Sequence, residues 1–159
     1  MGDKEATVRW TGKGLRFESV IPQTGVRFYQ DSPVEGGAVG PSPMDLVLAA
    51  VGGCTAMDVV SILEKMREPV RGLEVRVSGE RATDHPRIYR KVHVHYRVEG
   101  EGLDPEKVRK AIDLSQSKYC SVSAMVRASA ELTYGWEIAE AAAGGLAGAG
   151  KEAHDGAAD

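Results

Sequence analysis

The sequence has few of the features that mark a secreted, membrane-spanning or nucleic-acid-binding protein. It contains two cysteines in 159 residues, too few for a disulfide framework. No uninterrupted apolar run reaches the roughly 18 residues that span a bilayer, and the charged first residues predict no secretory signal. The net charge of −3 offers no concentrated basic surface for phosphate groups. We therefore expect a protein of the reducing cytoplasm that binds neither nucleic acid nor membrane.

The composition is that of one folded domain followed by a tail. Hydrophobic residues make up 42% and charged residues 27% of the chain, ordinary values that exclude a wholly disordered or fibrous protein. Alanine and glycine dominate only after residue 138, where few large apolar side chains remain. We predict a single domain over residues 1–138 and a disordered tail over 139–159.

Three short strands are predicted in the N-terminal third. Apolar and polar residues alternate along three segments, at 7–11, 15–18 and 26–29. This is the period of half-buried antiparallel strands. Glycine-containing turns are expected at 12–14 and 22–25, and a loop over 31–41. Trp10, Phe17 and Phe28 occupy apolar positions of these strands, so we expect them in the core.

A long helix is predicted next. Ser42 is a suitable N-cap, Pro43 fits the first helical position and Asp45 completes a capping box. Pro69 ends the helix. Residues 46–57 are apolar or small on every side, which describes a fully buried helix. Its alanines and glycines predict close packing against another helix, for which a second subunit is one source.

The remainder of the domain combines long strands with shorter helices. The expected elements are strands at 73–78 and 92–98, a helix from 104 to about 119, a short helix restarting at 120 or 121, and a last strand at 128–138. Trp136 lies on the apolar face of that last strand. The element order predicts an α+β fold with antiparallel sheet and segregated helices.

Two histidines on one predicted strand face suggest a metal pair at first sight. His93 and His95 share that face with Lys91 and Arg97, whose charges would repel a cation. A third ligand is not evident nearby. We therefore expect a solvated outer face and no metal ion.

The environment of Cys54 leaves two interpretations open. Gly52 and Gly53 precede it inside the predicted helix. Each glycine costs a helix interior roughly 1 kcal/mol relative to alanine, so close packing, or space beside the sulfur, is expected in return. A buried structural cysteine and a functional thiol are both compatible with this pattern.

The two thiols differ in their expected electrostatics. Cys120 lies where a helix restarts, and free amide groups there would lower its thiol pKa. Cys54 is twelve residues past Ser42, beyond the reach of its helix dipole, so its thiolate needs an outside cation. The candidates are basic residues of the predicted N-terminal strands, Lys13, Arg16 and Arg27. Asp58, on the same helical face as Cys54, disfavours the thiolate.

Each cysteine lies in a distinctive block of sequence. The first block, residues 41–56, includes Ser-Pro-Met-Asp and ends in Gly-Gly-Cys-Thr-Ala; the second, residues 115–122, contains Lys-Tyr-Cys-Ser-Val. Both blocks, their separation and the element order resemble the OsmC/Ohr family of thiol-dependent hydroperoxide reductases, and most of all its YhfA-like branch. The resemblance covers about residues 5–138.

The resemblance implies a fold, an assembly and a chemistry. Sheets would pack on the long central helix of a homodimer with swapped elements. Cys54 would attack an organic hydroperoxide and become a sulfenic acid, and Cys120 would resolve that acid as a disulfide. Arg16 is the candidate for activating the thiolate. An external dithiol would reduce the disulfide, and no cofactor is required.

One departure from the family pattern keeps a second hypothesis open. Met44 stands where the peroxidatic branches carry a glutamate, and the neighbouring Asp45 is explained by the capping box. The alternative is a non-enzymatic dimer whose interface holds a small apolar or electrophilic ligand, with Cys54 in the wall. A Cys54 thiol that titrates like a free cysteine would favour this alternative.

Overall fold

The computed structural model describes residues 3–32 and 39–140. Its elements, in chain order, are β1 (Thr7–Trp10), β2 (Phe17–Ile21), β3 (Val26–Gln30), α1 (Pro43–Lys65), β4 (Val70–Arg81), β5 (Tyr89–Gly100), α2 (Pro105–Leu114), the π-helical turn η1 (Ser115–Tyr119), α3 (Ser121–Arg127) and β6 (Glu131–Ala139). The α+β class is thus confirmed. The middle of the expected 31–41 loop and the tail after residue 140 lie outside the described residues.

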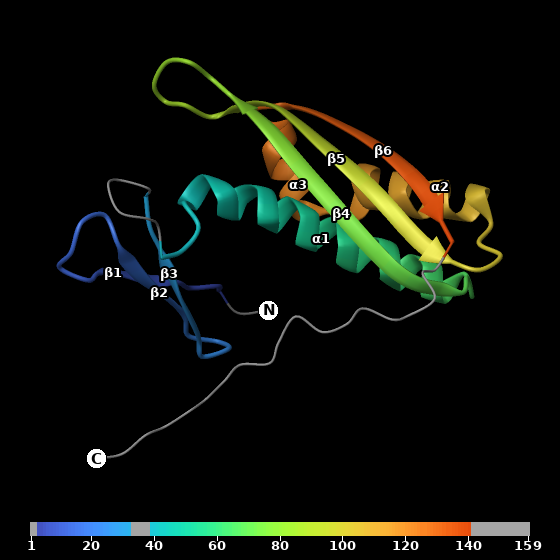
Figure 1. Ribbon diagram of the computed structural model, residues 1–159, viewed down its shortest axis with the longest axis horizontal. Helices are drawn as coiled ribbons and strands as arrows, with labels where there is room; N and C mark the ends of the chain where they lie inside the picture. Colours follow the sequence, from blue (N-terminus) through green and yellow to red (C-terminus); the bar gives the residue numbers. More distant parts are fainter. Residues whose placement is uncertain (1–2, 33–38, 141–159) are drawn as a thin grey trace, which may run out of the picture.

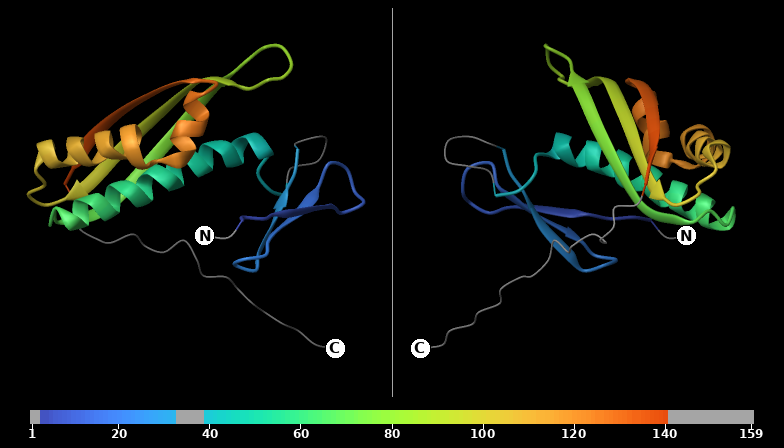
Figure 2. Two further views of the ribbon diagram at one scale, coloured as in Figure 1. Left: turned by 180° about the vertical axis from the view of Figure 1, so that it is seen from behind. Right: turned by 45° about the vertical axis from the view of Figure 1, so that its right-hand side comes forward.

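The core lies between the C-terminal sheet and the helices that cover one of its faces (Figures 1 and 2). The strand order is β4-β5-β6, with β5 in the centre. Its inward positions, together with residues of α1 and α2, form the buried apolar cluster, which includes Val92, Val94, Tyr96, Val98, Val51, Val59, Leu63, Val108, Ala111 and Ile112. Trp136 of β6 packs against this cluster as predicted.

The last strand departs from the predicted antiparallel arrangement. β4 and β5 pair antiparallel, but β6 pairs parallel to β5, with Val92 opposite Leu132 and Val98 opposite Ile138. A parallel neighbour requires a crossover connection. The helices between β5 and β6 provide it, returning the chain to the end of the sheet where β5 began (Figure 1).

Helix α1 begins and ends where the sequence predicts. The Ser42 amide donates to the Asp45 carboxylate at 2.9 Å, and the Asp45 amide donates to the Ser42 hydroxyl at 3.3 Å. This reciprocal capping box confirms the structural role expected for Asp45. Met44 presents its backbone carbonyl to the hydroxyl of Tyr89 at 2.9 Å, which ties the start of α1 to β5.

The expectation that α1 is fully buried is wrong within one chain. Only 22% of its most apolar 18-residue window is buried, although by length and composition the helix would also suit a bilayer. Met57 is 76% exposed. Gly52 approaches a strand instead of the expected helix, because a Cβ there would lie 3.1 Å from Cγ2 of Val77, while a Cβ on Gly53 would meet open space. One side of α1 packs on the C-terminal sheet and another packs against α2, η1 and α3, while the face that carries Met57 has no partner among the described residues.

The N-terminal sheet is a three-stranded antiparallel meander, β1-β2-β3. It lies beyond the N-terminal end of α1 and apart from the C-terminal sheet (Figure 2). Trp10 is 62% exposed, and its indole N–H donates to the Gly14 carbonyl at 3.0 Å. The prediction of a core position for Trp10 is therefore wrong within one chain, and Phe17 and Phe28 are half-buried. The meander has too few strands and too little cover to bury an apolar face by itself.

Truncation of Leu63 to alanine should lower the free energy of unfolding by about 2–5 kcal/mol, because a fully buried leucine leaves a cavity. Glu64→Ala, at the next and exposed position, is the matched control and should stay within about 0.5 kcal/mol of the parent. Urea denaturation followed by circular dichroism measures both. Equal losses in the two variants would contradict this placement of Leu63.

Candidate functional site

The two cysteines, 66 positions apart in sequence, meet between α1 and the start of α3. The sulfur atoms of Cys54 and Cys120 and a carboxylate oxygen of Asp58 all lie within 4.8 Å of one another. Both cysteines are free. A disulfide has its sulfurs about 2.05 Å apart, so the two sulfur atoms would have to move closer to form one.

Helix α1 places Cys54 and Asp58 on one face, since residues four apart are neighbours on a helix. Both side chains are half-buried. Gly53 leaves open space beside Cys54, as the sequence predicts. The sulfur is thus within reach of a small molecule from solvent, while it stays anchored to a long, regular helix.

A local irregularity places Cys120. The turn η1 is π-helical, and the Cys120 amide donates to the Ser115 carbonyl at 2.8 Å. Single π-turns are common at functional sites because they reorient the next residue. Cys120 then caps α3, its sulfur accepting from the Ser123 amide at 3.4 Å. Only 3% of Cys120 is exposed, so it lies beneath Cys54 and away from solvent.

Burial outweighs the helix terminus in the electrostatics of Cys120. Desolvation raises the pKa of the Cys120 thiol, hydrogen bonds from Ser123 lower it, and the adjacent Cys54 raises it further. The net direction is upward, which corrects the expectation of a lowered pKa. A thiol that resists deprotonation is a poor first nucleophile.

A buried polar network supports the cysteines from below. Thr55 lies at its centre, with its hydroxyl 2.6 Å from the Tyr96 hydroxyl and 2.8 Å from that of Ser115. The Gln116 amide donates to Tyr96 at 2.6 Å and to Thr55 at 3.2 Å. Ser115 donates to Asp58 at 3.0 Å. Because the network joins α1, β5 and η1, it sets the spacing of the elements that carry the two sulfurs.

Arg127 of α3 closes this network. Its guanidinium donates to the backbone carbonyl of Gln116 and, at 2.8 Å, to the side-chain oxygen of the same residue. Sequence reasoning missed Thr55, Tyr96, Gln116 and Arg127 as part of the site. One signal was available: Tyr96 places a hydroxyl between Val94 and Val98 on the inward face of its strand, and a buried hydroxyl needs partners.

The basic residues proposed to activate Cys54 belong to the N-terminal sheet, beyond the end of α1 (Figure 1). Arg16 pairs with Asp31 at 3.0 Å and Arg27 with Glu18 at 3.3 Å. Lys13 lies in the turn between β1 and β2. One chain therefore brings none of these residues to the middle of α1, and activation by Arg16 stays a prediction that requires a second copy.

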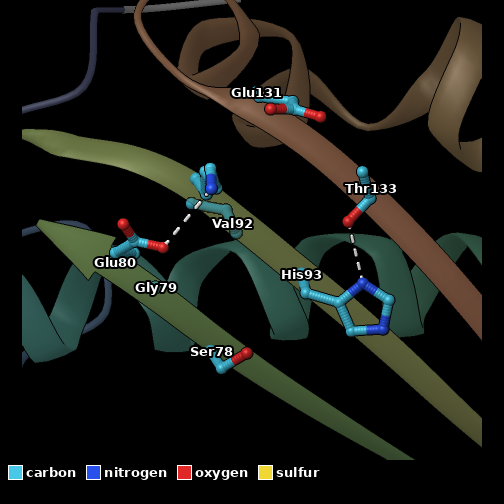
Figure 3. A pocket seen from close by; sticks show the side chains of 8 residues that line it. Ser78, Gly79, Glu80, Val92, His93, Glu131 and Thr133 are labelled. Carbon is cyan, nitrogen blue, oxygen red and sulfur yellow. Dashed lines mark hydrogen bonds and ion pairs between the residues drawn. The ribbon is translucent and has the colours of Figure 1, made fainter.

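The histidine face is a shallow hollow on the outer side of the C-terminal sheet, bordered by Ser78, Glu80, Glu131 and Thr133 (Figure 3). A ring nitrogen of His93 is hydrogen-bonded to the Thr133 hydroxyl at 2.8 Å. The His93 and His95 rings stack with centroids 6.5 Å apart, and His95 lies 3.5 Å from Glu137. Each imidazole thus has a polar partner on the outer surface of the sheet.

Comparisons with known proteins agree with this geometry. The chain matches the family described as OsmC-like protein over residues 35–135. It is 40% identical over 139 residues to the protein YhfA of Escherichia coli K12, covering 86% of this chain and 99% of that one. The structure of a hypothetical protein from Aquifex aeolicus VF5 matches with a TM-score of 0.78 at 31% identity, covering 89% and 99% of the two chains.

A more distant structure shares the fold. The organic hydroperoxide resistance protein OhrB of Bacillus subtilis matches with a TM-score of 0.62 at 16% identity, covering 86% of this chain and 98% of that one. The chain therefore belongs to the OsmC/Ohr family of OsmC-like proteins, and the resemblance predicted from its cysteine blocks is confirmed. Membership of this family supports a redox or peroxide-stress role.

Thr55→Val should lower the free energy of unfolding by about 1–3 kcal/mol, because it keeps the side-chain volume but leaves Tyr96 and Ser115 short of a buried partner. Thr133→Val makes the same chemical change on the exposed face of β6 and should cost less than about 0.5 kcal/mol. Thermal and urea unfolding measure both. A neutral Thr55→Val would show that the network contributes little to stability.

Proposed function

We propose that the protein is a thiol-dependent peroxidase that reduces organic hydroperoxides to alcohols. The observation that carries this proposal is the meeting of two free thiols of unequal exposure, Cys54 half-buried and Cys120 buried, within 4.8 Å. A redox couple of this kind needs one sulfur that is accessible to the substrate and a second, neighbouring sulfur that reacts with the oxidised first one. The two residues have these two positions.

The proposed reaction proceeds in two steps on the protein. The Cys54 thiolate attacks the terminal oxygen of ROOH, the O–O bond breaks, and the alkoxide takes a proton to leave as ROH. Cys54 is then a sulfenic acid. The Cys120 sulfur displaces its hydroxyl as water, forming a disulfide. The two electrons that reduced the peroxide thus come from the two thiols, and an external dithiol restores them by exchange.

A hollow between α1 and β4 is lined by apolar or small residues, namely Leu48, Ala49, Gly52, Gly53, Ala56, Val75 and Val77. Cys54 is not among them, since its sulfur lies on another side of α1, next to Cys120. An organic group on the peroxide is therefore proposed from the membership of the OsmC/Ohr family.

We propose further that the protein acts as a homodimer in the cytoplasm. The exposed apolar face of α1, with Met57 at its centre, and the uncovered Trp10 and Val8 of β1 are surfaces that a soluble monomer rarely leaves bare. A second copy that covers α1 would bury both. It would also bring the N-terminal sheet of one copy toward Cys54 of the other, where Arg16 is our candidate for stabilising the thiolate.

A second candidate function has its own supporting observation. The Asp58 carboxylate close to the Cys54 sulfur disfavours a thiolate. The alternative is an interface dimer that binds a small apolar or electrophilic ligand, with Cys54 as a wall residue. Titration of the Cys54 thiol in Cys120→Ser by iodoacetamide reactivity separates the two: behaviour like a free cysteine favours binding, and ionisation well below it favours catalysis.

Reduced protein should consume cumene hydroperoxide in the presence of a dithiol, and Cys54→Ser should remove this activity. Once the dithiol has been removed, reduced Cys120→Ser should still react once per chain and accumulate a sulfenic acid, which dimedone labelling and mass spectrometry detect. Cys54→Ser is the matched control for non-specific thiol oxidation, since it retains Cys120. Equal consumption by the parent and Cys54→Ser would contradict the proposed function.

Met57→Glu should shift the protein from dimer to monomer in size-exclusion chromatography with light scattering, because the charge would have to be buried between two α1 helices. Thr133→Glu places the same side chain on the exposed outer face of β6 and should leave the mass unchanged. A parent protein that is monomeric at micromolar concentration would refute the dimer and, with it, the proposed role of Arg16.

A further inference from the structure

Asp58 has no role in the redox couple, yet it lies at the same point as the two sulfurs. Two thiols suffice for peroxide reduction and disulfide formation, and a nearby negative charge opposes the thiolate that attacks. Among residues 3–32 and 39–140, no lysine or arginine forms an ion pair with Asp58. Its partner there is the Ser115 hydroxyl, at 3.0 Å. The carboxylate is therefore held in place without a cation of the protein to balance it.

We propose that the reduced protein binds a thiophilic divalent cation, with Zn²⁺ as the type, through Cys54, Cys120 and Asp58. One donor atom from each residue lies within 4.8 Å of the other two. Tetrahedral zinc has Zn–S distances near 2.3 Å and Zn–O distances near 2.0–2.2 Å, which set its ligand atoms roughly 3.3–3.8 Å apart. The three donors would have to approach one another by at most roughly 1–1.5 Å to reach that spacing.

Hydrogen bonds orient two of the three donors, as they do around the ligands of protein metal sites. Carboxylate ligands are usually oriented by an outer hydrogen bond, and Ser115 provides one to Asp58. The Ser123 amide orients the Cys120 sulfur at 3.4 Å. Half-buried Cys54 leaves an approach from solvent, and a water molecule or a group of a second subunit would complete the fourth position, as at zinc sites with three protein ligands.

The donor set selects the class of metal ion. Two sulfurs suit Zn²⁺ and similar borderline or soft ions, whereas Mg²⁺ and Ca²⁺ prefer oxygen ligands. On binding, both thiols release their protons to solvent, so two thiolates and one carboxylate face the dication. The Asp58 carboxylate destabilises a free thiolate, but it stabilises the metal-bound site, because the cation reverses the sign of the local charge.

Metal binding and thiol oxidation exclude each other at this site, and this consequence rests on the proposed function. In the balanced reaction, the zinc dithiolate, ROOH and two protons give the disulfide, Zn²⁺, ROH and water. Disulfide formation removes both sulfur ligands. By linkage, a cation that binds only the reduced protein must also protect it from oxidation, so zinc would slow peroxide consumption and peroxide would release zinc.

The test uses the full-length reduced protein under anaerobic conditions, with Co²⁺ as the spectroscopic probe and Zn²⁺ as competitor. We expect one Co²⁺ per chain with a sulfur-to-cobalt charge-transfer band in the near ultraviolet, displaced by Zn²⁺ but not by Mg²⁺. The oxidised protein should give no such band. Absence of the band from the reduced parent protein would overturn the proposal.

Matched variants assign the ligands. Cys54→Ser and Cys120→Ser should each lose most of the band, and Asp58→Asn, which keeps the shape and the acceptor for Ser115, should weaken binding about tenfold or more, since even outer-shell losses cost 10- to 100-fold. The double variant His93→Ala with His95→Ala should bind as the parent does. Unchanged affinity in Asp58→Asn, or lost binding in the histidine variant, would overturn the site. Thermal unfolding of the metal-free variants confirms that each is folded.

Peroxide consumption by chelator-treated protein separates this proposal from the proposed function. A protein that reduces cumene hydroperoxide but takes up no Co²⁺ keeps the peroxidase and loses the metal site. A protein that binds Co²⁺ through its thiols but consumes no peroxide keeps the metal site and loses the peroxidase. Both results are read from the same preparation of parent protein.

Discussion

The hydroxyl of Thr55 lies between Tyr96 of β5 and Ser115 of the π-helical turn, and this buried junction holds α1 at a defined distance from both. Cys54 directly precedes Thr55, and Cys120 directly follows the turn. The separation of the two sulfurs is therefore a consequence of hydrogen bonds one layer below them. Since buried polar groups are costly to leave unpaired, a displacement of α1 along the sheet that breaks these hydrogen bonds would be unfavourable.

Helix α1 has an apolar face that packs within the chain and another that stays exposed, and its sequence does not distinguish the two. Its uninterrupted apolar stretch predicts a helix buried on every side, whereas in one chain it packs between the C-terminal sheet and the segments α2, η1 and α3 and leaves Met57 exposed. Hydrophobicity reports that a surface leaves water; it does not report which molecule covers it. The same argument applies to Trp10 in the N-terminal meander. Both misplacements follow from treating the chain as its own complete environment.

The features predicted from sequence are those with local causes. The capping box of Ser42 and Asp45, the turns of the meander and the restart of helix at Cys120 are decided by a few neighbouring residues, and they are confirmed. The parallel direction of β6 depends on the path of three helical segments, and the polar network joins residues up to 61 positions apart. Such contacts follow from tertiary packing, which periodicity does not encode. The family resemblance supplied the pairing of cysteines that periodicity lacked.

Asp58 makes opposite contributions to the two chemistries proposed for one site. In the metal-free state its charge adds to that of any thiolate formed beside it, which raises the energy of the reactive form. With a dication present, the same charge strengthens the ligand set and lowers the energy of a form that does not react. A residue with both effects shifts the site from catalysis toward protection according to the supply of metal.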